Sequence, residues 1–121
     1  MSAFDDLSAI APLQIWPGLI GRALTGAEAT LAQIELDPDI DVPEHEHVNE
    51  QIGILTRGSL IFRIGDEEKE LRPGATWVIP AHVPHSVSSG PDGAALVELF
   101  VPRRDDWADR EVLDPRAPNA F

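Results

Sequence analysis

The spacing of proline and glycine limits what this chain can fold into. Eleven prolines and nine glycines divide its 121 residues into short apolar runs. Runs of about four to eight residues between turn residues are typical of strands and too short for most helices. Closely spaced short strands favour an antiparallel sandwich or barrel. The sequence therefore predicts an all-β fold with little helix.

The expected strands occupy most of the chain between residues 13 and 101. Residues 13–24 are apolar but interrupted by Pro17 and two glycines, which is consistent with short edge strands. Further strands are expected at 29–36, 51–56, 59–64, 67–71, 76–79, 85–89 and 94–101. Residues 1–12 form a loose or helical lead-in, and residues 108–121, rich in Asp, Arg and Pro, are expected to pack loosely on the outside.

Turn residues separate several of these strands. Arg57-Gly58 and Gly65-Asp66 have the composition of hairpin turns, and residues 72–74, Arg-Pro-Gly, turn the chain again. Sequence length and turn spacing together predict a single domain over residues 1–121, with a core from about residue 13 to residue 107.

Composition and charge exclude several function classes. A hydrophobic content of 43% favours a globular chain, and no apolar run approaches the length of about 18 residues that a membrane helix needs. The net charge of −12 disfavours binding to nucleic acid or to an anionic membrane, which both require a basic surface. Asp5 and Asp6 replace the basic start of a secretory signal, so a cytoplasmic location is expected.

The histidines carry the strongest functional signal. His45 and His47 lie two residues apart, and His82 and His85 follow in a second segment. With no cysteine in the chain, clustered histidines point to a metal held by imidazole nitrogen, such as Ni, Zn, Fe, Mn or Co. We expect one divalent ion.

Strand geometry suggests how the ligands converge. If residues 45–55 form one strand, its alternation places His45, His47 and Gln51 on one face and Glu50 on the other. His85 would then come from a neighbouring strand. The predicted metal ligands are His45, His47, Gln51 and His85; Glu50 is the alternative to Gln51 and would require a bulge.

These segments resemble the two motifs of the cupins. Residues 45–51 read H-E-H-V-N-E-Q and are followed by Gly58, and residues 74–85 share the Gly, Pro and final His of the second motif. The resemblance implies a single antiparallel double-stranded β-helix, or jelly-roll barrel. Two departures stand out: Gln51 occupies the place of the usual Glu, and His82 replaces a turn glycine. We expect His82 at a positive φ, in a backbone role or as a contact to a metal ligand.

A narrower resemblance links residues 96–107 to the pectin-degradation cupins, which open 4,5-unsaturated uronic acids to linear keto-uronates. Their metal set also pairs three histidines with a Gln. The positions matching their pocket residues are Glu98, Phe100 and Arg104, with Glu98 replacing an Asp. The resemblance implies that Glu98 and Arg104 are catalytic and that Phe100 and Arg104 bind substrate. Each position also has an alternative without a functional role. Glu98 would face solvent, Phe100 would belong to the core, and Arg104 would pair with Asp105 or Asp106 at the surface.

The sequence leaves two classes of function open. One is a metal-dependent enzyme acting on a small oxygenated acid, with a sugar acid such as an unsaturated uronate favoured; a dioxygenase is its competitor within that class. The other is a non-catalytic cupin that binds metal or sugar. Exposed edge strands near residues 13–24 also predict a homodimer that buries Trp16 or Trp107, whereas Trp77 is expected to line the pocket or the back of the barrel.

Overall fold

A computed structural model describes residues 2–121, which form nine strands and two short 3-10 helices, η1 and η2. None of the helices in this range is long and apolar enough to cross a membrane. The elements in chain order are η1 Leu7–Ala9, β1 Leu13–Trp16, β2 Leu19–Thr25, β3 Thr30–Leu36, β4 Asp41–His45, β5 Glu50–Ile64, β6 Glu67–Leu71, β7 Thr76–Ile79, β8 His85–Val101, η2 Asp105–Asp109 and β9 Glu111–Val112.

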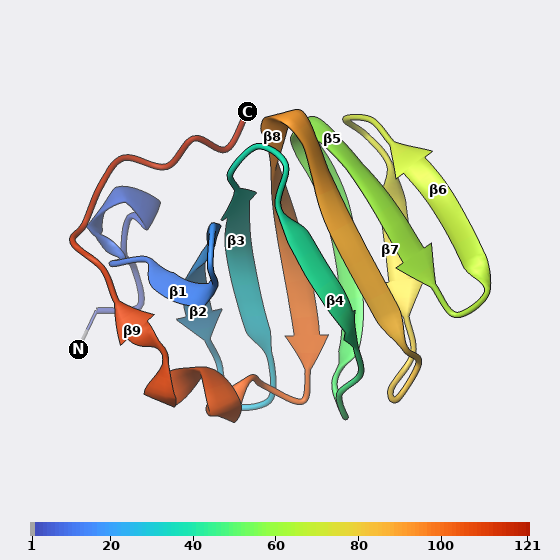
Figure 1. The fold of residues 1–121 in the computed structure, drawn as a ribbon. Helices are drawn as coiled ribbons and strands as arrows, with labels where there is room; N and C mark the ends of the chain where they lie inside the picture. The colour runs from blue at the N-terminus through green and yellow to red at the C-terminus, as the bar shows by residue number, and fades with distance from the viewer. Residues whose placement is uncertain (1) are drawn as a thin grey trace.

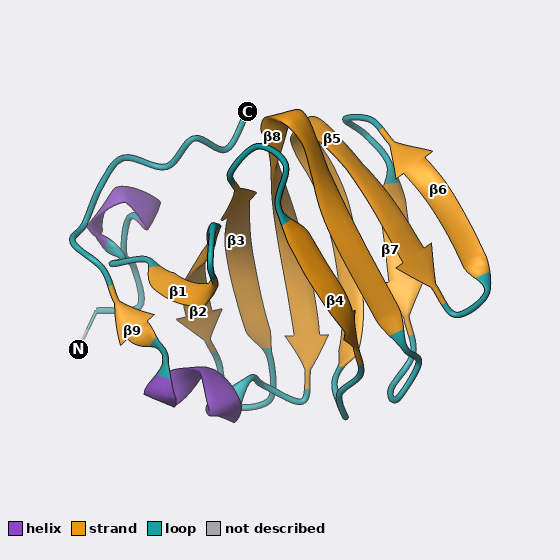
Figure 2. Ribbon diagram, viewed as in Figure 1, coloured by secondary structure: helices purple, strands orange, loops and turns teal. Residues whose placement is uncertain are grey.

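The strands form two layers of antiparallel sheet, joined by β5 and β8 (Figures 1 and 2). The first half of β8 pairs with β4 and with the second half of β5, which also pairs with β6. The second half of β8 pairs with β3 and with the first half of β5, which also pairs with β7. Strands β2, β1 and β9 extend this second layer beyond β3. The arrangement is the antiparallel jelly roll expected from the sequence.

The two long strands correct the expected pattern. Residues 51–56 and 59–64 belong to the single strand β5, and residues 85–101 form the continuous strand β8. Arg57-Gly58 is not a hairpin turn: it lies at a bulge, where the register with β8 shifts and Gly58 adopts a φ of 75°. The expected turns at Gly65-Asp66 and at residues 72–74 are present.

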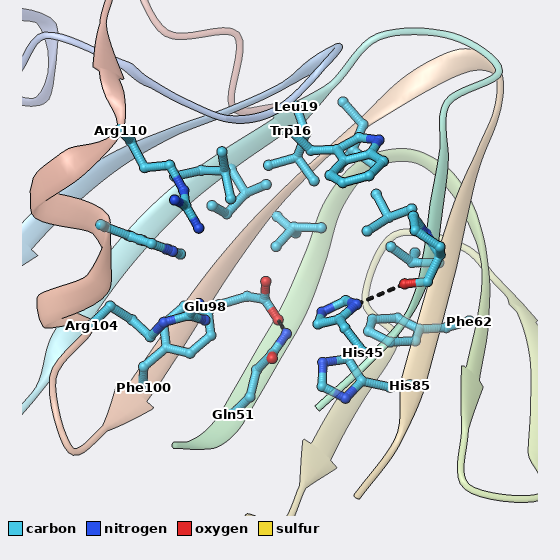
Figure 3. A pocket seen from close by; sticks show the side chains of 18 residues that line it. Trp16, Leu19, His45, Gln51, Phe62, His85, Glu98, Phe100, Arg104 and Arg110 are labelled. Carbon is cyan, nitrogen blue, oxygen red and sulfur yellow. Dashed lines mark hydrogen bonds between the residues drawn. The ribbon is translucent and has the colours of Figure 1, made fainter. Parts of the chain in front are cut away.

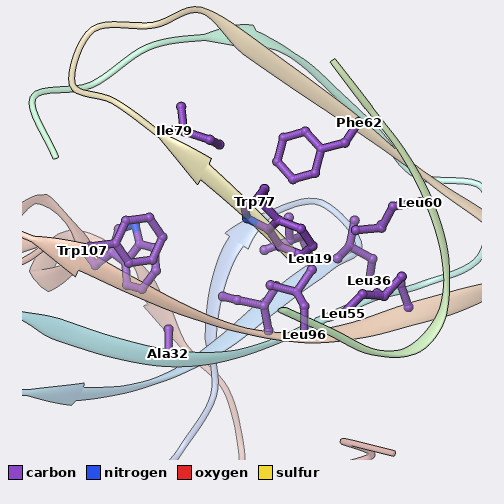
Figure 4. Packing of buried hydrophobic residues seen from close by; sticks show 13 residues of the cluster. Leu19, Ala32, Leu36, Leu55, Leu60, Phe62, Trp77, Ile79, Leu96 and Trp107 are labelled. Carbon is purple, nitrogen blue, oxygen red and sulfur yellow. The ribbon is translucent and has the colours of Figure 1, made fainter. Parts of the chain in front are cut away.

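The hydrophobic core fills the space between the layers (Figure 4). Leu55, Leu60 and Ile79 are almost inaccessible to solvent, and Phe62 packs against Trp77 with ring centroids 5.2 Å apart. Trp107 is also part of this cluster and is only 4% exposed. The expectation that a dimer buries Trp107 is therefore wrong, because its own chain already covers it.

The C-terminal residues are not loosely attached. Strand β9 pairs with β1, and the chain then crosses the outer face of the β2–β3 region. Arg22, fully buried on β2, pairs with Glu35 at 2.6 Å and donates to the carbonyl of Arg116 at 3.0 Å. The backbone N–H of Asn119 donates to the same Glu35 carboxylate at 3.1 Å. The ion pair of Arg22 and Glu35, on the outer face of β2 and β3, thus holds the C-terminal residues against the sheet.

Candidate metal centre

Three histidines converge at one end of the space between the layers. His45 ends β4 and His85 begins β8, and the two residues face each other as Cα partners in the β4–β8 pairing. His47 lies in the loop between β4 and β5. One nitrogen of each ring lies within 4.8 Å of the others. The sequence predicts one continuous strand through His45 and His47. The structure instead has the end of a strand at His45, followed by a loop that carries His47.

Backbone carbonyls orient all three rings in the same way. The Nδ1 atoms of His45, His47 and His85 lie 2.8, 2.9 and 2.9 Å from the carbonyl oxygens of Pro43, Asn49 and Val83. A carbonyl can only accept, so each Nδ1 carries the proton and each Nε2 keeps its lone pair. This tautomer is the one that metal-binding histidines adopt when a neighbouring acceptor holds the other nitrogen.

Gln51 brings an oxygen to the same point. On β5 its side chain is buried and faces inward, with Oε1 3.0 Å from Nε2 of His47. With the proton on Nδ1, both of these atoms are acceptors, and their contact is favourable only with a cation against them. Glu50 is exposed on the opposite face of β5, which removes it as the alternative ligand.

Burial keeps two of the imidazoles neutral. It lowers the pKa of His85 to about 4, while the carbonyl of Val83 acts in the opposite sense. Burial also lowers the pKa of His47, and the positive charge of Arg104 adds to this effect. The Nε2 atom of His85 is buried and has no hydrogen-bond partner in residues 2–121. Neutral rings with unpaired nitrogens fit a divalent metal ion.

Glu98 lies beside this cluster and faces inward. Its Oε2 accepts hydrogen bonds from the Gln51 amide and, at 2.9 Å, from Nε1 of Trp77. Burial raises the pKa of Glu98, although both donors lower it. Because both donors use Oε2, the other oxygen remains for the cavity, and Figure 3 shows it pointing there. The solvent-facing alternative for Glu98 is wrong.

A glycine makes the Trp77 contact possible. Gly53 lies between Glu98 and Trp77 in the sheet, since it is the Cα partner of both. A Cβ at Gly53 would lie 2.5 Å from Nε1 and Cζ2 of the Trp77 indole. The indole therefore crosses β5 only because residue 53 has no side chain. The alternation of residues 51–55 pointed to an inward position here but not to this role.

Phe100 and Arg104 form the next part of the wall. Phe100 is 2% exposed, and the Arg104 guanidinium carbon lies 4.8 Å from its ring centroid and 4.7 Å from that of Trp107. Arg104 donates from Nε and Nη2 to the two oxygens of Asp106, at 3.0 and 2.9 Å. This pair lowers the pKa of Asp106. Arg104 thus both lines the cavity and forms the ion pair considered as its structural alternative.

These residues enclose a cavity of about 280 Å³ (Figure 3). Six polar side chains line it: His45, Gln51, His85, Glu98, Arg104 and Arg110. The rest of its wall is apolar and includes Trp16, which is 40% exposed. Arg110 was not expected from the sequence, because nothing in residues 108–121 distinguished it from a surface arginine. His82 lies at a φ of 62°, as predicted, and its N–H donates to the carbonyl of His47 at 2.9 Å.

The cupin domain family Cupin_2 matches residues 32–102, which include every residue of the histidine cluster. The chain belongs to the cupin family. Cupins commonly bind a metal ion, and the three histidines of this cupin could hold one. No curated protein matches the sequence.

Solved structures of other cupins share the fold. An RmlC-like cupin from Shewanella frigidimarina is 24% identical with a TM-score of 0.81, over 88% of this chain and 96% of that one. KdgF from Halomonas sp. is 23% identical with a TM-score of 0.79, over 88% and 98%. An oxalate decarboxylase variant from Bacillus subtilis is 19% identical with a TM-score of 0.70, over 84% of this cupin but 31% of its own chain. At these identities the likeness shows the fold alone.

Proposed function

We propose that this cupin is a metal-dependent enzyme in which His45, His47, Gln51 and His85 hold one divalent ion. The observation that carries the proposal is the neutral donor set: three oriented imidazoles and an amide oxygen that faces His47 Nε2 at 3.0 Å. An ion bound by neutral ligands keeps its full charge, and would polarise an oxygen of the substrate as a Lewis acid. The substrate class is a small oxygenated acid.

Glu98 is the proton-transfer group of the proposed reaction. Burial raises the pKa of Glu98, which makes this carboxyl better suited both to take up and to release a proton. Gln51 and Trp77 hold one of its oxygens, and the other faces the cavity beside the histidines. Gln51 therefore has two tasks: its oxygen belongs to the ligand set, and its amide nitrogen orients the acid.

Arg104 and Phe100 position the substrate. Asp106 holds Nε and Nη2 of Arg104, so the guanidinium is fixed in place with Nη1 left to donate to a substrate oxygen. Phe100 supports that guanidinium with its ring and closes the cavity beside His47, at a centroid distance of 6.0 Å.

The specific reaction we propose is ring opening of a 4,5-unsaturated uronic acid. In this isomerisation the C1 hydroxyl loses its proton, the bond from C1 to the ring oxygen breaks, and the resulting enolate gains a proton at C4. Glu98 can accept the first proton and return one at C4. The proposal is supported by the resemblance of residues 45–51 and 98–104 to the pectin-degradation cupins.

The test combines metal analysis with a substrate assay. Protein purified without added metal should contain about one ion per chain, and His47→Ala should lose it while keeping a β-type circular dichroism spectrum. The parent should accelerate the loss of unsaturated-uronate absorbance beyond the spontaneous rate. Full metal content in His47→Ala would contradict the ligand set. No acceleration with any divalent metal would refute uronate ring opening and favour the dioxygenase or the binding protein.

We further propose that two copies form a homodimer through the outer face of the larger layer. The register places Val78, Ile52, Leu99, Leu31 and Leu24 in one row across five strands. Four of these side chains are between 39% and 58% exposed, namely Ile52, Leu31, Leu24 and Val78. An exposed apolar row of this kind marks an interaction surface. A monomeric mass by light scattering at micromolar concentration would contradict the dimer.

A further inference from the structure

Two arginines line the cavity, but only Arg104 has a direct ion-pair partner among residues 2–121. Arg104 forms a two-bond ion pair with Asp106 and stacks on two rings. Arg110 forms no side-chain hydrogen bond or ion pair with any residue between 2 and 121. Its Nε is buried without a partner. A ligand would therefore meet two different groups. Arg104 is already paired with Asp106 and has three of its five N–H groups left, whereas Arg110 offers a whole guanidinium.

The position of Arg110 directs this group inward. Arg110 immediately follows η2, and its backbone N–H donates to the carbonyl of Trp107 at 3.1 Å, which fixes the turn into β9. From there the side chain extends into the cavity on the side where Trp16 and Leu19 lie, as Figure 3 shows. Hydrogen bonds from Arg104 occupy both carboxylate oxygens of Asp106 and lower its pKa, and the charge of Arg110 also lowers this pKa.

Arg110 therefore lines the cavity without a direct ion-pair partner among residues 2–121. An unpaired charge in a partly buried site is costly, and a bound anion removes that cost. This inward cation is notable in a chain of net charge −12, whose exposed surface repels anions.

We propose that Arg110 binds the carboxylate of a small monocarboxylic acid whose body lies against the apolar wall. The wall opposite the polar groups is aliphatic, including Leu19, Ile34, Leu36, Val87 and Leu96, and offers no hydrogen-bond partners for a second charged group. A volume of about 280 Å³ admits one small ring or a short chain. This inference rests on the proposed function, because it takes the same cavity as the substrate site. Arg110 would bind the substrate's carboxylate, and Arg104 would bind a second oxygen.

The test uses an unreactive pair of ligands that differ only in charge. Cyclohexanecarboxylate and cyclohexanecarboxamide are titrated into the purified protein by calorimetry, with the fluorescence of Trp16 and Trp107 as a second signal. The acid should bind at least about tenfold more tightly than the amide, since a charge-assisted pair of hydrogen bonds is lost with the amide. Equal affinities, or no binding of the acid, would overturn the proposal without any variant being needed.

Variants then locate the charge. Arg110→Gln should reduce the affinity for the acid to about that for the amide, while Arg110→Lys should retain part of it. Arg103→Gln is the matched control, because Arg103 is 44% exposed, pairs with Asp105 at 2.7 Å and does not line the cavity. It removes the same charge and should change affinity less than about twofold. An equal effect of the two Gln variants would overturn the assignment.

The metal provides the remaining distinction. Acid binding that disappears with the metal and is unchanged in Arg110→Gln would place the carboxylate on the ion and overturn the proposal. Acid binding that survives chelation and depends on Arg110 supports it. Neither result depends on turnover, so the failure of the uronate assay and the failure of this inference can be told apart.

Discussion

Gly53→Ala tests whether the acid in the cavity depends on the path of one indole. The added Cβ would lie 2.5 Å from Nε1 and Cζ2 of Trp77, well inside van der Waals contact. Trp77 is 6% exposed and packs on Phe62, so the indole has no open space to move into. Overpacking of this kind costs about 2 kcal/mol, and moving the indole also weakens its 2.9 Å hydrogen bond to Glu98.

The assay is thermal unfolding followed by circular dichroism. For a chain of 121 residues, about 2 kcal/mol corresponds to a decrease in Tm of about 8 °C. Gly26→Ala is the matched control, because a Cβ there meets nothing closer than the carbonyl oxygen of Ala29 at 3.6 Å. Its free energy of unfolding should stay within about 0.5 kcal/mol of the parent's.

A double-mutant cycle isolates the contact. Trp77→Leu removes the indole atoms that the new Cβ would strike, so Gly53→Ala should cost clearly less in that background than in the parent. A loss of stability in Gly53→Ala as small as that in Gly26→Ala, or one that is the same with and without the indole, would refute the proposed clash.

Further predictions concern proton transfer, pH and the C-terminal tail. Glu98→Gln should slow turnover, and Arg104→Ala should lower kcat/KM by about a hundredfold. Both variants should keep the parent's metal content, measured by atomic spectroscopy. Loss of the ion would show a structural effect instead. In metal-free protein the folded His85 has a pKa of about 4 against 6.5, so the unfolded chain binds more protons between these values. In urea titrations, the free energy of unfolding of the metal-free protein should fall by about 3 kcal/mol as the pH falls from 6.5 to 4. His85→Asn should reduce this dependence on pH, whereas His82→Asn, at an exposed position, should not. Arg22→Met should lower the free energy of unfolding by about 3 kcal/mol and expose residues 113–121 to carboxypeptidase. A tail that stays undigested would contradict the role of Arg22 in holding it.

Local chemistry in the sequence was sufficient for the fold class and for most turns. Short apolar runs between Gly and Pro gave strands, and Gly65-Asp66 gave a hairpin turn. Arg57-Gly58 is a bulge and not the expected turn, because a glycine at positive φ suits both, and only the pairing of β5 with β8 distinguishes the two. The histidine cluster was predicted from motif spacing, although the expected single strand through His45 and His47 is in fact a strand end and a loop.

What the sequence determined alone was the set of groups available: four histidines, no thiol, and an acid and an arginine six residues apart at Glu98 and Arg104. Which groups meet was decided by the tertiary structure, because pairing brings together residues far apart in the chain. Only the sheet shows that Gly53 lets Trp77 reach Glu98, that the tail is held by a buried Arg22, and that Asp106 neutralises Arg104. Only the packing makes Arg110 face the cavity without a direct ion-pair partner among the described residues, since a lone arginine in an irregular segment carries no periodic signal.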